Sequence, residues 1–172
     1  DLAGVVEAVL HATGLPAASL KLEITEGGFI GDLPAAQVTL RRLRAKGVAW
    51  SIDDFGTGYS SLSLLHQLRV DTVKIDRSFV TRVGAGDSAA DVVRAIVTLA
   101  HNLSMDVVAE GVEHEDQAIG LRALGCEYVQ GFLYSRPVDA QAATWLIASQ
   151  PWCRTEPAYA TTGRVASANS AA

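Results

Sequence analysis

The sequence predicts an α/β fold built from about five parallel βα units. Short apolar strands alternate with amphipathic helices five times along the chain, which is the pattern of parallel βαβ units. A polar residue stands at the end of each strand. Two architectures fit this pattern, an open doubly wound sheet and part of a (β/α)8 barrel. A complete barrel typically has eight strands and about 250 residues. Five strands cannot close such a barrel, so if these 172 residues form one, it is an incomplete TIM-type barrel whose N-terminal strands are absent.

The first half of the chain contains three expected helices and two expected strands. Leu and Val residues at helical spacing predict a helix over residues 1–11, which Gly14 and Pro16 terminate. Alternating polarity predicts a strand over residues 19–25. A helix over 34–46 closed by Gly47, a buried strand over 48–52 and a short helix near 62–68 follow. An acidic, Gly-rich loop separates the last two elements.

The second half repeats the alternation. Strands are expected over 72–75, 105–109 and 127–130, and helices over 115–124 and from a cap at Asp87 or Ser88 to residue 102. Asp139 is expected to cap a last helix that ends near residue 148. Residues 1–150 are thus expected to form one partial domain. Residues 151–172, which are rich in Ala, Ser and Thr, are expected to be a disordered tail.

Composition excludes several classes of function. The net charge is -5 and no basic stripe is present, which argues against a nucleic-acid duplex as partner. No apolar run approaches the roughly 18 residues that span a bilayer, and the first residues do not resemble a signal peptide. The spacing of the two cysteines, Cys126 and Cys153, indicates free thiols in a reducing, cytoplasmic environment. The histidines are scattered outside the strand ends and do not form a zinc site: His11, His66, His101 and His114.

The chemistry is concentrated at the ends of the expected strands. Parallel strands bring their carboxyl ends to one side of a sheet, so these side chains are expected to converge: Glu23, Asp53, Asp54, Lys74, Asp76, Glu110 and Gln130. Carboxylates at this density suit Mg²⁺ or Mn²⁺, and two such ions can clamp a phosphodiester for in-line hydrolysis. Lys74 would orient the attacking water or neutralise developing charge. It would alternatively serve only as an ion pair among the acids.

Five motifs resemble those of the EAL-domain cyclic di-GMP phosphodiesterases. In order they are Leu22-Glu23-Ile24-Thr25-Glu26, Asp53-Asp54-Phe55-Gly56-Thr57-Gly58-Tyr59-Ser60-Ser61, Val73-Lys74-Ile75-Asp76, Ala109-Glu110-Gly111-Val112-Glu113, and Gln130-Gly131-Phe132 with Ser135-Arg136-Pro137. The resemblance covers residues 1–150 and implies a (β/α)8 barrel with one antiparallel strand. It also implies hydrolysis of cyclic di-GMP to linear pGpG with Mg²⁺ or Mn²⁺. The family's Glu-Ala-Leu strand and an Asn-bearing strand would precede Asp1. The chain thus matches the C-terminal two-thirds of the domain, and by itself it is expected to be inactive.

The resemblance also implies a role for each matching residue. Metal-binding acids are Glu23, Asp53, Asp54, Asp76 and Glu110. Lys74 is similar to the lysine that positions the catalytic water. Together with Glu110, the residues Gln130 and Glu113 resemble those of the reaction centre and its water network. Support of the substrate and of the loop after Asp54 is implied for Glu26, Thr57, Gly58, Arg136 and Pro137.

Two other functions compete with the phosphodiesterase. A catalytically silent EAL-like domain would bind cyclic di-GMP or a partner protein, but such domains typically lose the acids or the lysine that this chain keeps. A phosphoacceptor receiver domain also uses paired acids and a lysine. In that fold, however, the acids follow the first strand and the lysine follows the last. The resemblance further implies a homodimer and an upstream sensor or GGDEF-like domain. The location would be cytoplasmic, or tethered to the membrane through such modules.

Overall fold

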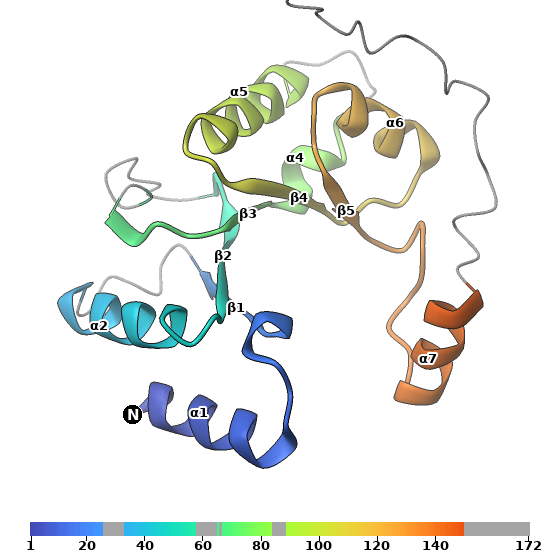
Figure 1. The fold of residues 1–172 in the computed structure, drawn as a ribbon. Helices are drawn as coiled ribbons and strands as arrows, with labels where there is room; N and C mark the ends of the chain where they lie inside the picture. Colours follow the sequence, from blue (N-terminus) through green and yellow to red (C-terminus); the bar gives the residue numbers. More distant parts are fainter. Residues whose placement is uncertain (26–32, 58–64, 66, 84–88, 150–172) are drawn as a thin grey trace, which may run out of the picture. The chain divides into compact units, whose positions relative to one another are not determined.

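The computed structural model describes residues 1–25, 33–57, 65, 67–83 and 89–149. The chain divides into two compact units, Asp1–Ser135 and Arg136–Ala172. The first unit holds a five-stranded sheet (Figure 1). Its strands are β1 (Lys21–Thr25), β2 (Ala49–Phe55), β3 (Thr72–Ile75), β4 (Asp106–Glu110) and β5 (Tyr128–Gln130).

Strand order decides between the two architectures that the sequence allows. A doubly wound sheet reverses its strand order at a switch point. In this sheet each strand pairs with the next one along the chain, and all four pairings are parallel. This is the order of strands in a (β/α)8 barrel. The prediction of about five parallel βα units in barrel order is confirmed, and the doubly wound alternative is excluded.

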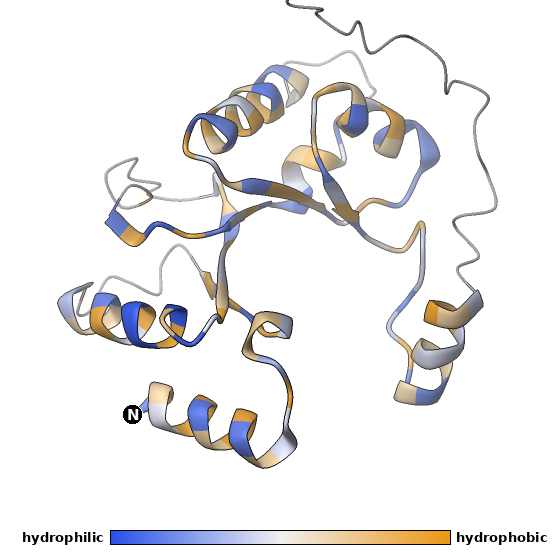
Figure 2. Ribbon diagram, viewed as in Figure 1, coloured by the Kyte–Doolittle hydropathy of each residue, from blue (hydrophilic) through white to orange (hydrophobic). Residues whose placement is uncertain are grey.

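Amphipathic helices cover one face of the sheet. They are α1 (Leu2–Thr13), α2 (Leu33–Arg44), α5 (Ala89–Asn102) and α6 (Glu115–Ala123), with a short η1 (Ala17–Ser19) and α4 (Arg77–Val80) between strands. Figure 2 shows hydrophilic and hydrophobic positions alternating along α2 and α5. Leu43 of α2, Val93 of α5 and Leu121 of α6 are fully buried. Burying each such side chain stabilises the fold by about 1.5–3 kcal/mol.

The other face of the sheet carries polar side chains in layers. Because successive residues of a strand point to opposite faces, Thr72 and Lys74 share this face. Thr72 is fully buried and accepts a hydrogen bond of 2.8 Å from Lys21 Nζ on β1. Lys74 lies one layer nearer the carboxyl ends of the strands. The polar side chains on this face therefore extend to the carboxyl ends of the strands, where the candidate site lies.

Two acids connect neighbouring strands at the opposite end of the sheet, where the strands begin. Asp71, just before β3, accepts a hydrogen bond of 2.8 Å from Trp50 N on β2 and pairs with Arg44 at 3.0 Å. Glu127, just before β5, accepts one of 2.9 Å from Val107 N on β4 and lies 2.6 Å from His101 Nε2. In each case the acid preceding one strand binds the strand before it. These carboxylates therefore hold neighbouring strands together.

Several element boundaries differ from the sequence expectations. The strand expected over 48–52 continues to Phe55, because Phe55 is buried and pairs with Ile75. The strand expected from residue 19 begins at Lys21, after η1. Helix α4 was not expected, since four residues are too few to show a periodic pattern. Gly14 ends α1 in the left-handed conformation with φ 67°, as predicted.

Other expectations fall partly or wholly outside the described residues. Of the short helix near 62–68, residues 65, 67 and 68 are described and are helical. The caps at Asp87 and Ser88 and the tail over 151–172 lie outside the described residues, so the domain boundary at 150 stays a prediction. In the second unit, helix α7 (Ala140–Ser149) follows Asp139, whose carboxylate accepts a hydrogen bond of 2.8 Å from Ala142 N. None of the described helices has both the length and the apolar character that crossing a membrane requires.

Candidate active site

Lys74 lies at the centre of the strand-end cluster. Its Nζ atom is 2.7 Å from Glu23 Oε2, 3.0 Å from Asp53 Oδ1 and 2.5 Å from Glu110 Oε1. These partners come from β1, β2 and β4, and only 8% of the Lys74 side chain is exposed. The structure therefore brings together the carboxylates and the lysine that the sequence placed at the ends of separate strands.

Charge and burial act on Lys74 in opposite directions. Burial lowers the pKa of a lysine because the ammonium loses its hydration. Hydrogen bonds to Glu110, Glu23 and Asp53 favour the ammonium and outweigh burial, so the pKa of Lys74 is raised above its ordinary value. Lys74 is thus a fixed cation at neutral pH. It can donate hydrogen bonds and neutralise charge, but it cannot accept a proton as a general base.

A β-bulge lets two adjacent aspartates serve the same site. In a regular strand Asp53 and Asp54 would point to opposite faces. The register against β3 shifts between Ile52 and Phe55, and Asp54 adopts φ 54°, a left-handed conformation that Asp tolerates better than most residues. As a result, Asp53, Asp54 and Glu110 each offer a carboxylate oxygen, and these oxygens lie within 4.8 Å of one another.

This group fits a divalent metal in charge and in donor type. Lys74 supplies one positive charge among Glu23, Asp53, Asp54 and Glu110, so negative charge is in excess. Oxygens that bind one Mg²⁺ ion at about 2.1 Å lie up to roughly 4.2 Å apart. The observed spread of 4.8 Å is within a small side-chain adjustment of that value. Carboxylate oxygens without sulfur or imidazole favour Mg²⁺ or Mn²⁺ over zinc.

Asp76 is placed differently from the other candidate acids. Its Oδ1 atom accepts a hydrogen bond of 3.0 Å from Ser78 N and caps α4. The hydrogen bond with the Ser78 side chain, aided by the bond from the Ser78 amide, lowers the pKa of Asp76 because both favour the carboxylate. Among the described residues, Asp76 is not part of the three-carboxylate group. Its role at a second metal stays a prediction.

Glu113 lies on the loop after β4, and Gln130 is the last residue of β5. Glu113 pairs with Arg77 at 2.8 Å, and its amide donates a hydrogen bond of 2.9 Å to Gln117 Oε1. Gln130 is opposite Glu110 in register, has an exposed side chain and accepts a hydrogen bond from Val112 N through its carbonyl oxygen. Their predicted parts in a water network are therefore compatible with their positions but stay predictions.

Sequence reasoning did not identify Arg77 or the close approach beside it. Arg77 orients Glu113, and its side chain packs against Gly111, where a Cβ atom would lie 2.5 Å from Arg77 Cγ. Gly111 also has φ 69°, which favours glycine. The Gly that directly follows Glu110 was the available signal for this contact.

The remaining candidates concern the loop after β2 and the second unit. Thr57 donates a hydrogen bond of 2.9 Å from Oγ1 to the carbonyl oxygen of Asp54, which closes the turn after the bulge. Glu26 and Gly58 lie outside the described residues. Arg136 and Pro137 belong to the second compact unit, so their contribution to the site stays a prediction.

Residues 2–137 match the family model described as EAL domain. Among curated relatives, the uncharacterized protein Rv1354c of Mycobacterium tuberculosis is 48% identical over 150 residues, which is 84% of this chain and 24% of that protein. The cyclic di-GMP phosphodiesterase NbdA of Pseudomonas aeruginosa is 45% identical over 143 residues, covering 81% of this chain and 18% of NbdA. The chain therefore spans about a quarter or less of the length of these relatives.

Solved structures show the same relationship. The EAL domain of Mycobacterium smegmatis DcpA has a TM-score of 0.81 and 44% identity, covering 86% of this chain and 66% of that chain. The PaMucR phosphodiesterase in complex with c-di-GMP has a TM-score of 0.75 and 46% identity, covering 80% of this chain and 56% of that chain. A manganese/cy-diGMP complex of Klebsiella pneumoniae BlrP1 has a TM-score of 0.74 and 36% identity, covering 80% of this chain and 35% of that chain.

Proposed function

Because this chain belongs to the EAL domain family, we propose that the protein containing it is a metal-dependent phosphodiesterase that hydrolyses cyclic di-GMP to linear pGpG. The observation that carries the proposal is the contact of one buried ammonium, Lys74, with carboxylates from three strands. Relatives named as cyclic di-GMP phosphodiesterases, and a related phosphodiesterase solved with c-di-GMP, support the choice of substrate.

The proposed chemistry opens one phosphodiester bond. The oxygen of water forms a bond to phosphorus and the bond from phosphorus to the ribose O3′ breaks. The water loses a proton and O3′ gains one, so the single linear product carries a 5′-phosphate and a 3′-hydroxyl. Mg²⁺ or Mn²⁺ held by Asp53, Asp54 and Glu110 would polarise the phosphoryl oxygen and lower the pKa of a bound water. Glu23 and Asp76 are the further proposed ligands, which would complete a two-metal site.

Lys74 contributes through its fixed positive charge. Its ammonium is held by carboxylates that a metal would also attract, so metal binding would release N–H donors for the water and the phosphate oxygens. These donors stabilise the negative charge that develops at the phosphoryl group. Gln130 and Glu113 are proposed to hold the water network around them, with Glu26, Thr57 and Gly58 positioning the loop after β2.

Partners and location are part of the same proposal. MucR of Pseudomonas aeruginosa is named as a bifunctional diguanylate cyclase and cyclic di-GMP phosphodiesterase, and this chain covers 21% of it. We propose that the EAL domain here likewise works beside an upstream sensor or GGDEF-like domain, and as a homodimer. An enzyme for an intracellular second messenger would act in the cytoplasm.

The proposal is tested with the full-length protein, because the chain matches only 66% of the DcpA EAL domain. The protein is incubated with cyclic di-GMP and Mn²⁺ or Mg²⁺, and pGpG is measured by chromatography. Lys74→Ala should abolish turnover and keep nucleotide binding. Lys21→Ala is the matched control, since Lys21 lies on the same polar face but hydrogen-bonds Thr72. Unchanged turnover in Lys74→Ala, or no turnover in the wild type with either metal, would contradict the proposed phosphodiesterase activity.

A further inference from the structure

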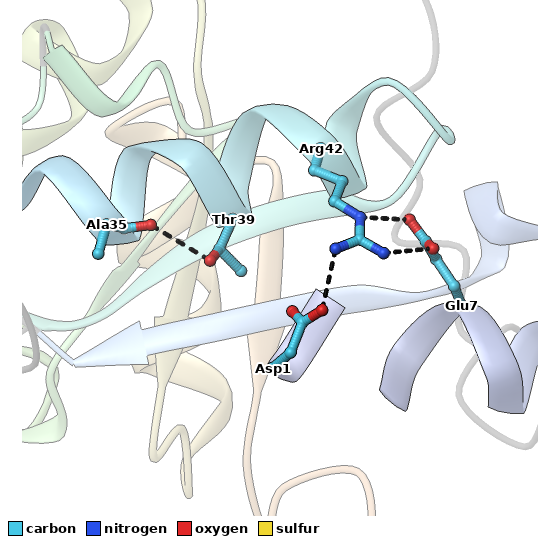
Figure 3. A network of polar contacts seen from close by, with 5 residues as sticks. All are labelled: Asp1, Glu7, Ala35, Thr39 and Arg42. Atoms are coloured by element: carbon cyan, nitrogen blue, oxygen red, sulfur yellow. Dashed lines mark hydrogen bonds and ion pairs between the residues drawn. The ribbon is translucent and has the colours of Figure 1, made fainter. Parts of the chain in front are cut away.

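The arginines of α2 are divided between two sides of the helix. Arg42 faces α1, where it donates hydrogen bonds of 2.9 and 2.8 Å to Glu7 and one of 3.0 Å to Asp1 (Figure 3). Arg41 and Arg44 follow Gln37 and Leu40 at helical spacing and line a different groove. The two groups of arginines therefore have different surroundings although they are neighbours in sequence.

That groove is a cavity of about 450 Å³ between α2 and the segment before β3. One wall is formed by Gln37, Leu40, Arg41 and Arg44, and the other by Gln67, Leu68 and Arg69. Leu40 and Leu68 are buried, at 5% and 4% exposure, and give the cavity an apolar base. Pockets that hold small molecules typically measure about 300–1,000 Å³. The cavity is large enough for a small organic ligand.

Positive charge in this cavity is not balanced by its lining. Three of the lining residues are arginines and none is acidic. Asp71 pairs with Arg44 at 3.0 Å, and within the described part of the chain Arg41 and Arg69 form no ion pair. The net charge of the whole chain is -5, so the cavity has the opposite sign to the protein. Guanidinium groups bind phosphate oxygens through paired hydrogen bonds.

Helix ends explain only part of this arrangement. A cation in the last turn of a helix is favoured by the helix dipole, which accounts for arginine near the end of α2. Arg69 follows a separate helical segment and has φ 49°, a conformation that costs free energy for a residue with a Cβ atom. Gly or Asn would adopt it more readily. An arginine therefore occupies position 69 although the backbone conformation there favours a residue without a bulky side chain.

We propose that this cavity binds a small molecule with a diphosphate group, such as a nucleoside diphosphate. Arg41 and Arg69 hold the phosphate oxygens, Arg44 joins them when its pairing with Asp71 is exchanged for the ligand, and Gln37 and Gln67 contact the organic part. The cavity is built from α2 and residues 67–69, whereas the strand-end site is built from β1, β2, β3 and β4. The proposed site is therefore separate from the phosphodiesterase site.

The test is isothermal titration of the purified full-length protein with ADP and with inorganic pyrophosphate. EDTA is present so that no metal at the strand-end acids can bind phosphate. ADP should bind, more tightly than pyrophosphate, and the affinity should fall as NaCl is raised from 50 to 300 mM. Arg41→Gln and Arg69→Gly should each weaken ADP binding about tenfold or more, since each removes a charge-assisted contact.

Two variants separate binding from folding. Arg42→Gln removes the same charge from the adjacent position and should leave ADP affinity unchanged. Arg69→Gly relieves the left-handed backbone, so its melting temperature should equal or exceed that of the wild type. The proposal is overturned if ADP does not bind at millimolar concentration, if it binds no better than pyrophosphate, or if Arg42→Gln weakens binding as much as Arg41→Gln. Turnover of cyclic di-GMP is not part of this readout, so the two proposals fail independently.

Discussion

Replacing Lys74 with Met tests how much the central ion cluster contributes to stability. Met keeps the buried aliphatic part of the side chain and removes the ammonium. Glu23 is 47% exposed, so its pairing is worth at most about 1 kcal/mol. Asp53 and Glu110 are 23% and 21% exposed, and hydrogen bonds between charged groups contribute about 1.5–3 kcal/mol each. Desolvation of the ammonium offsets part of this, leaving a net loss of about 2–3 kcal/mol.

The loss is measured by urea unfolding in EDTA. Lys21→Met is the control, because Lys21 donates a single hydrogen bond to a neutral group, Thr72. For a domain of this size a loss of 2–3 kcal/mol corresponds to a decrease in melting temperature of about 5–10 °C. Added Mn²⁺ should reduce the deficit of Lys74→Met, because a cation then takes the place of the ammonium. Equal stability of the two variants in EDTA would refute the reasoning.

The pH dependence of the same difference follows from the direction of the pKa shift. The pKa of Lys74 is raised in the folded state, so its contribution is complete below the pKa of an unfolded lysine, about 10.4. It is lost only as the pH rises through the folded pKa, which is higher. The stability difference between wild type and Lys74→Met should therefore stay constant from pH 7 to about pH 10. A difference that disappears near pH 8 would contradict this.

Three further predictions concern single sites. Asp76→Ser should keep the cap of α4, because Ser also accepts a hydrogen bond from Ser78 N, whereas Asp76→Ala should lower the free energy of unfolding by about 1 kcal/mol. Weaker Mn²⁺ binding by Asp76→Ser at unchanged stability would show that Asp76 is a metal ligand. Unchanged Mn²⁺ binding would exclude that role. Gly131→Ala should destabilise the fold by several times the effect of Gly14→Ala, measured by urea unfolding, because the new Cβ atom would collide with the backbone of Val112, while nothing lies within 4 Å at Gly14. In a Cys153→Ser background, Cys126 should react slowly with iodoacetamide at pH 8, because burial raises its pKa to about 11 and leaves about one thiolate in a thousand; rapid alkylation of the folded protein would refute its burial.

Much of the fold follows from local patterns that the sequence displays. Alternation of apolar strands with amphipathic helices predicted the five βα units, and the end of α1 at Gly14 followed from the preference of glycine for positive φ. The order of strands did not follow from these patterns. It depends on which strands pair, and pairing is a long-range property that adjacent residues do not encode.

The convergence of Lys74 with acids from neighbouring strands was predictable, but its local geometry was not. Parallel strands bring their carboxyl ends together, and this placed Glu23, Lys74 and Glu110 in contact. The bulge at Asp53 and Asp54 was not predicted, since the sequence reads as a strand ending before two loop acids. The burial of Phe55 opposite Ile75 continues the strand and produces the bulge. Arg77 was missed because it has no pattern of its own and acts through Glu113.

The two ends of the sheet use the same residue types for different purposes. At the beginning of the strands, Asp71 and Glu127 each secure the preceding strand through a backbone amide. A cut placed before Glu127 would therefore loosen β4 as well as remove β5, since Val107 would lose its acceptor. Shortening the chain from its C-terminus should consequently weaken the strand that precedes the deletion as well as remove the deleted one.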